Sequence, residues 1–66
     1  MPEVVVFLAA GRTDEMKKGL MKDISEAVVK NCNVPIGAVT VSIMETALVN
    51  KMKGGETFAE RAAKPK

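Results

Sequence analysis

Three successive segments of the 66-residue chain follow different hydrophobic periods, and their order constrains the fold more than any other feature. Residues 3–9 are apolar and β-branched without polar alternation, which is typical of a strand covered on both faces. Residues 14–31 have an apolar stripe at helical spacing, formed by Met16, Leu20, Ile24, Ala27 and Val28. Residues 38–44 alternate, as a second strand does. We therefore predict an α/β fold, a single βαβ unit with parallel strands and a right-handed crossover.

The residues between these segments are suited to ending them. Gly11 permits a tight turn after the first strand, and either Thr13 or Asp14 can cap the helix. Pro35 pushes the residue before it out of helical geometry, so the helix is expected to end earlier. Charged helix positions outside the stripe are expected to be solvated surface, and they are Lys17, Lys18, Lys22, Asp23 and Glu26.

The C-terminal part of the chain predicts a small addition to the same unit. Gly54 and Gly55 indicate a turn or short hairpin, and residues 59–66 are expected to form a loose, charged tail. Because no linker composition interrupts the chain, residues 1–66 are expected to form a single domain.

The predicted unit is too small and too apolar to stand alone. A two-stranded sheet with one helix leaves its second face bare, and a chain of this length buries only about 60% of its surface on folding. The hydrophobic content is 47%, and the only cysteine, Cys32, cannot form an intramolecular disulfide. We therefore predict an oligomer. Cys32 is expected to be a small buried hydrophobe, with a redox-active thiol as the alternative.

The composition argues against several classes of protein. The net charge is +2 with both signs interspersed, and the only aromatic residues, Phe7 and Phe58, are too few for a base-stacking surface. No segment reaches the roughly 20 apolar residues of a membrane span, and the first residues do not resemble a secretory signal. A free cysteine suits a reducing compartment, so we expect a cytoplasmic protein.

Pro2 directly follows Met1 and directly precedes the first predicted strand. Removal of Met1 would leave a secondary amine at the start of the chain. The chain has no histidine and no Cys/His cluster, so no metal site is expected and this amine is the ready-made base. An α-amino group titrates near pH ~8, and apolar surroundings or a nearby cation lower that pKa. Pro2 is therefore a candidate general base, although a proline here also suits a sheet edge.

Arg12 lies in the turn predicted between the first strand and the helix. Its guanidinium presents a rigid fork that matches a carboxylate, and the preceding Gly11 permits the turn that would present it. Arg12 is therefore a candidate carboxylate-binding residue, with an ordinary surface charge as the alternative.

The order of these features resembles that of the 4-oxalocrotonate tautomerase family. The resemblance extends over about residues 2–56 without a gap, and it rests on Pro2, the segments 11–15 and 24–28, Pro35, the valine-rich strand, Glu45 and Gly54-Gly55.

The resemblance implies that Met1 is cleaved, that the Pro2 nitrogen moves a proton between carbons next to a carbonyl, and that Arg12 contacts a substrate carboxylate. Such proton transfer needs a base of near-neutral pKa and a cation that stabilises the enolate. The resemblance also implies a small carboxylate substrate, no cofactor, and active sites between the subunits of a hexamer built as a trimer of dimers. A homo-hexamer is expected, with a heteromer as the alternative.

Two positions depart from the family pattern. Members of the namesake type have Val-Arg-Val on the second strand, whereas this chain has Thr40 between its two valines. Lys51 occupies the position where members of the family usually have an aromatic side chain that lines the active site. We hypothesise that Lys51 restores part of the lost positive charge, and a plain surface lysine is the alternative.

Two other functions stay open. The same scaffold could hydrate, dehalogenate or decarboxylate a small unsaturated acid, with Glu45 as the nominal water-activating carboxylate. Alternatively, the chain could be a less active subunit of a heteromeric ring, in which Thr40 and Lys51 mark lost function.

Overall fold

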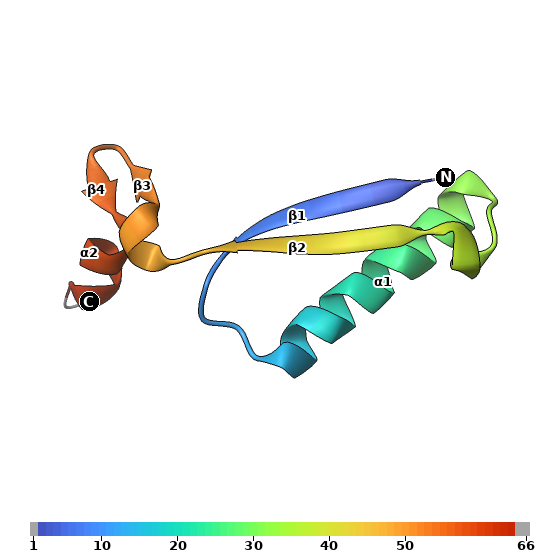
Figure 1. The fold of residues 1–66 in the computed structure, drawn as a ribbon, viewed down its shortest axis with the longest axis horizontal. Coiled ribbons are helices and arrows are strands. Elements are labelled where there is room, and N and C mark those ends of the chain that lie inside the picture. The colour runs from blue at the N-terminus through green and yellow to red at the C-terminus, as the bar shows by residue number, and fades with distance from the viewer. Residues whose placement is uncertain (1, 65–66) are drawn as a thin grey trace.

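The computed structural model describes residues 2–64 and consists of a βαβ unit followed by a small C-terminal unit (Figure 1). The βαβ unit contains β1 (Glu3–Ala9), α1 (Asp14–Cys32) and β2 (Thr40–Thr46). The two strands pair in parallel, with Glu3 opposite Thr40 and Ala9 opposite Thr46. The predicted α/β fold is confirmed, as are the bounds expected for the first strand.

The second strand begins later than the alternation predicts. One turn of 3-10 helix, η1 (Ile36–Ala38), occupies the start of the predicted range. Ala38 donates its N–H to the carbonyl of Pro35 at 3.0 Å, and Val39 donates its N–H to the carbonyl of Ile36 at 3.2 Å. Because these amides bond within the turn, the ladder with β1 starts only at Thr40.

Both ends of α1 follow from local chemistry. The Thr13 hydroxyl caps the helix by accepting the N–H of Met16 at 3.1 Å, and Asp14 adds negative charge in the first turn. At the other end Asn33 adopts the left-handed conformation, with φ 55°, and donates its N–H to the carbonyl of Val29 at 3.1 Å. The cap predicted at Thr13 or Asp14 is therefore Thr13.

The half-buried side of α1 differs in part from the predicted apolar stripe. α1 lies along one side of the sheet and packs against β2 (Figure 1). Ile24 and Val28 are half-buried as predicted, but Met16 is 58% exposed and Ala27 is also exposed. The half-buried side of the helix is formed by Lys17, Met21, Ile24, Ser25, Val28 and Val29. Lys17 lies on this side, and its ammonium bonds to a carboxylate on β2.

The sheet face opposite α1 is bare and includes three large apolar side chains. Strand alternation and the parallel register place Val5 and Phe7 of β1 on this face together with Met44 of β2. These three residues are 46%, 71% and 54% exposed, respectively. The single chain therefore covers only one face of β1, and the cover predicted for the other has to come from outside the chain.

The dimensions of the chain agree with a missing partner. No residue in the range 2–64 is buried, and the radius of gyration is 15.3 Å, against about 11 Å for a compact chain of this length. The accessible surface is 5131 Å², against about 4,100 Å² for a folded monomer of this mass. The excess of roughly 1,000 Å² is comparable to the surface that one partner buries in a stable interface.

The C-terminal unit projects beyond the end of β2 (Figure 1). It contains a 3-10 turn, a two-strand hairpin and a short helix, with the bounds η2 (Leu48–Asn50), β3 (Met52–Lys53), β4 (Glu56–Thr57) and α2 (Phe58–Ala63). The hairpin turn is confirmed at Gly54 and Gly55, which both adopt positive φ, at 64° and 81°.

The loose tail predicted for residues 59–66 is wrong for residues 59–63, which are helical. A capping box starts this helix: Glu60 donates its N–H to the Thr57 hydroxyl at 3.0 Å, and Thr57 donates its N–H to the Glu60 carboxylate at 2.9 Å. The bonds that Thr57 donates to this carboxylate, from its N–H and from its hydroxyl, hold the pKa of Glu60 below its usual 4.5. Residues 65–66 of the predicted tail lie outside the described residues.

Neither helix within residues 2–64 is long and apolar enough to cross a membrane.

Candidate functional site

Pro2 directly precedes β1, whose first residue lies beside the first residue of β2. Its carbonyl accepts the N–H of Thr40 at 3.1 Å, and the residue is half-buried. The backbone of Pro2 is therefore held by the sheet. Thr40 lies at the same end of the sheet and is exposed. It stands where members of the namesake type have the arginine of Val-Arg-Val.

Arg12 lies at the other end of β1. Gly11 turns the chain with φ 130°, a value that favours glycine, and Arg12 follows with its Nη1 donating to the carbonyl of Ala9 at 3.2 Å. The side chain borders a hollow of about 200 Å³ whose other lining residues are Leu8, Met16, Lys17 and Leu20. A cation beside an apolar wall is suited to a carboxylate on a small apolar body.

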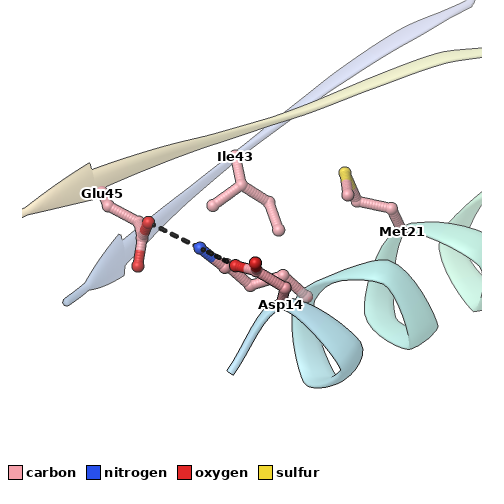
Figure 2. A pocket seen from close by; sticks show the side chains of 5 residues that line it. Asp14, Met21, Ile43 and Glu45 are labelled. Atoms are coloured by element: carbon pink, nitrogen blue, oxygen red, sulfur yellow. Dashed lines mark hydrogen bonds and ion pairs between the residues drawn. The ribbon is translucent and has the colours of Figure 1, made fainter. Parts of the chain in front are cut away.

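A second hollow of about 350 Å³ lies between α1 and β2 (Figure 2). Lys17 spans it, with its Nζ 2.8 Å from a Glu45 oxygen and 3.4 Å from an Asp14 oxygen. Met21 and Ile43 form the apolar part of the lining. The hydrogen bond to Glu45 raises the pKa of Lys17 above its usual 10.5.

The contact between Lys17 and Glu45 concerns the predictions made for both residues. The side chain of Lys17 is only 21% exposed, so the expected solvated position is wrong because the helix turns Lys17 toward β2. The sequence does contain a signal, since Lys17, Met21 and Ile24 share one helix face by their spacing. Glu45, considered as a water-activating carboxylate, has its oxygen bonded to Lys17, and this contact favours a structural role.

Lys51 lies in the C-terminal unit, where it ends η2 and is half-buried. Its ammonium lies 5.4 Å from the centre of the Phe58 ring, within the range of a cation–π contact. Its carbonyl accepts the N–H of Phe58 at 2.8 Å. Sequence reasoning assigned no role to Phe58, because the two residues become neighbours only through the hairpin turn.

The candidate residues do not meet within one chain. β1 has seven residues, which corresponds to about 23 Å at about 3.3 Å per residue. Pro2 lies before this strand and Arg12 beyond it, while Lys51 lies beyond the end of the parallel β2. A site that contains Pro2 together with either cation therefore has to combine residues from different copies.

Two further expectations concern sulfur and metals. Cys32, the last residue of α1, is exposed, so its expected burial is wrong. Among residues 2–64, no three His, Cys, Asp or Glu side chains lie together as a metal site would need.

Residues 2–61 match the family of tautomerase enzymes. The chain belongs to the tautomerase family. It is therefore an enzyme of the isomerase class, and the resemblance inferred from Pro2, Arg12 and the glycine pair is confirmed at the level of the family.

Named relatives agree with this assignment. A probable tautomerase of Bradyrhizobium diazoefficiens is 56% identical over 66 residues, which cover 100% of this chain and 98% of the relative. A 2-hydroxymuconate tautomerase of Stutzerimonas stutzeri is 35% identical over 57 residues, covering 86% of this chain and 90% of the relative.

Solved structures of the family have the same fold. TomN, a 4-oxalocrotonate tautomerase homologue in the tomaymycin biosynthetic pathway, is 31% identical with a TM-score of 0.90, covering 98% of this chain and 100% of that chain. A heterohexamer 4-oxalocrotonate tautomerase from Chloroflexus aurantiacus is 28% identical with a TM-score of 0.85, covering 91% and 97%.

Proposed function

We propose that this tautomerase interconverts the enol and keto forms of a small carboxylic acid without a cofactor, with the nitrogen of Pro2 as the general base. The observation that carries the proposal is the position of Pro2, whose backbone is fixed at the first rung between β1 and β2. A base held by a sheet rather than by a loose chain end can be oriented toward a reacting carbon.

The proposed reaction needs a free amine, so it requires removal of Met1. A prolyl α-amine with a pKa near ~8 has a substantial neutral fraction at neutral pH. The neutral nitrogen takes a proton from a hydroxyl or a carbon in conjugation with the carbonyl, and the resulting prolinium returns a proton to another carbon of the same system. The substrate keeps its atoms, and the amine is regenerated.

Arg12 is proposed to bind the substrate carboxylate. Its guanidinium borders an apolar hollow, and a bidentate contact to a carboxylate would orient the substrate as well as stabilise charge. Because Arg12 lies beyond the far end of β1 from Pro2, we propose that the two residues of each site come from neighbouring copies.

The assembly is proposed to be a homo-hexamer arranged as a trimer of dimers. The bare face with Val5 and Phe7, together with the excess surface of roughly 1,000 Å² over a folded monomer, supports extensive contacts between copies. One related structure is a heterohexamer, and Thr40 replaces an arginine of the namesake type. The second candidate is therefore a low-activity subunit of a heteromeric ring. Co-purification of a related chain from the native source would favour that candidate.

The substrate class is proposed to be an enol or keto acid with one carboxylate bound at Arg12 and, in a dicarboxylate, a second one bound at Lys51. The 35%-identical relative is named for 2-hydroxymuconate, and Lys51 is the cation that could take over from the arginine replaced by Thr40. A location in the cytoplasm is proposed because the thiol of Cys32 is free and exposed.

The base is tested by the intact mass and by a pH–rate profile. The active protein is expected to lack the mass of Met1, and kcat/KM for ketonisation of 2-hydroxymuconate should rise as the amine loses its proton. Pro2→Ala exchanges the rigid secondary amine for the flexible primary amine of alanine, and it should lower kcat by about 100-fold, the lower end of what a positioned general base contributes. An active protein that retains Met1, or a Pro2→Ala variant with unchanged rates, would refute the assignment.

Arg12 is tested by Arg12→Ala, with Lys18→Ala as a control that removes a positive charge from the exposed helix surface. Loss of a charged hydrogen bond to the carboxylate should lower kcat/KM by roughly tenfold to 100-fold in the first variant. Equal effects of the two substitutions would mean that only the overall charge matters.

A further inference from the structure

Two cationic side chains of the C-terminal unit lie close to the ring of Phe58. The Lys51 ammonium is 5.4 Å from the ring centre, and the Arg61 guanidinium is 5.8 Å from it. Cations within about 6 Å of an aromatic ring are attracted to its face. Phe58 therefore contacts Lys51, the residue at the position where the family usually has an aromatic side chain.

The ring is held in place by the backbone of its own unit. Phe58 donates its N–H to the Lys51 carbonyl at 2.8 Å, and it is the first residue of the capped helix α2. Arg61 donates from Nη2 to the carbonyl of Lys53 at 3.1 Å, which ties α2 to the hairpin. These bonds hold the backbone that carries the Phe58 ring beside the backbone of Lys51.

The charges of the unit leave Lys51 available for an anion. Glu56 pairs with Arg61 at 3.5 Å and also with Lys64. In contrast, no carboxylate of residues 2–64 forms an ion pair with Lys51. An ammonium has three donors, and contact with a ring face leaves donors free.

We propose that Phe58 positions Lys51 to bind the second carboxylate of a dicarboxylic enol or keto acid. The inference rests on the proposed function and specifies its substrate class. A lysine side chain loses much rotamer freedom when it binds, and a ring that already restrains it reduces that cost. Phe58 is therefore a positioning residue that acts through Lys51, and the pair performs the role of the arginine replaced by Thr40.

The test compares a dicarboxylate, 2-hydroxymuconate, with a monocarboxylate, enol phenylpyruvate. Phe58→Leu retains an apolar side chain without the π face, and it should raise KM for the dicarboxylate about two- to fivefold. The kcat for the dicarboxylate and both constants for the monocarboxylate should stay unchanged. Phe58→Tyr restores the ring and should behave as the original protein.

A double-mutant cycle separates positioning from packing. Lys51→Met retains the length of the side chain without its charge, and it should raise KM for the dicarboxylate more than Phe58→Leu does. If Phe58 acts through Lys51, adding Phe58→Leu to Lys51→Met causes no further rise. Additive effects, or an equal rise in KM for both substrates with Phe58→Leu, would overturn the proposal.

Binding of unreactive acids tests the Lys51–Phe58 subsite without turnover. Adipate and hexanoate have the same chain length and differ by one carboxylate, and their binding can be followed in every variant through the NMR shifts of the backbone amides of the C-terminal unit. We expect adipate to bind more tightly in the original protein and to lose that advantage in Lys51→Met and in part in Phe58→Leu. Absence of turnover with both enol acids would refute the proposed function alone. Equal affinity for adipate and hexanoate would refute the Lys51–Phe58 subsite alone.

Discussion

Replacing Phe7 should weaken the association of the chains, because this side chain is the most exposed part of the bare sheet face. Phe7 is 71% exposed in the single chain, so covering it removes about 140 Å² from water if a phenylalanine can bury about 200 Å². At about 25 cal/mol per Å², this area corresponds to about 3.5 kcal/mol per copy. Phe7→Ser, which leaves little apolar area, should cost about 3 kcal/mol, or about 100-fold in the association constant per copy.

Sedimentation velocity over a range of protein concentrations measures this effect. Phe7→Leu keeps most of the apolar area and should weaken association about tenfold at most, while Lys18→Ser changes an exposed helix position and serves as the surface control. A closed symmetric interface contains the substitution on both sides, so its effect on a dimer counts twice. If Phe7→Ser assembled as tightly as Phe7→Leu, the bare face would not be an interface.

Three further predictions concern the two units separately. Thr57→Ala removes the cap of α2 and should destabilise this helix by about 1 kcal/mol, whereas Thr57→Ser should not; equal amide exchange of residues 58–63 in both variants would contradict the capping role. The pKa of Glu60 is lowered by its bonds to Thr57, so its contribution to stability is present above pH 4.5 and is lost as the pH falls through the lowered value. Glu60→Gln should abolish that loss in the same exchange experiment, and a persisting loss would assign it to another group. The pKa of Lys17 is raised by Glu45, so its contribution is present below pH 10.5 and disappears as the pH rises through the raised value. Alkaline unfolding should lose this dependence in Lys17→Met but keep it in Lys18→Met, and identical curves for the two variants would argue against the Lys17–Glu45 pair.

The βαβ unit could be predicted because its signals are local. The β-branched run of residues 3–9 matches β1, and the cap at Thr13 follows from side-chain chemistry alone. Lys17 was missed because a charged residue on a helix is normally solvated, and only its partner on β2, far along the chain, explains its position. The helix at residues 59–63 was missed although Thr57 and Glu60 have the spacing of a capping box.

The residues of the candidate site could be predicted from the sequence, but the contacts between their side chains could not. Pro2 and Arg12 stand out in the sequence through their chemistry, and the strand predicted between them, confirmed as β1, already separates them. The contact between Lys51 and Phe58 depends on the hairpin turn at Gly54 and Gly55, which brings residues seven apart in the chain together. Periodicity contains no information on such a contact.

Complementation between two impaired variants tests most directly whether each site combines Pro2 of one copy with Arg12 of another. Pro2→Ala and Arg12→Ala chains are unfolded, mixed in equal amounts and refolded together, and their activity is compared with that of each variant refolded alone. Random assembly should return about a quarter of the original activity, since about one shared site in four then contains both intact residues. Activity no greater than the mean of the two variants refolded separately would show that the sites are not shared between chains.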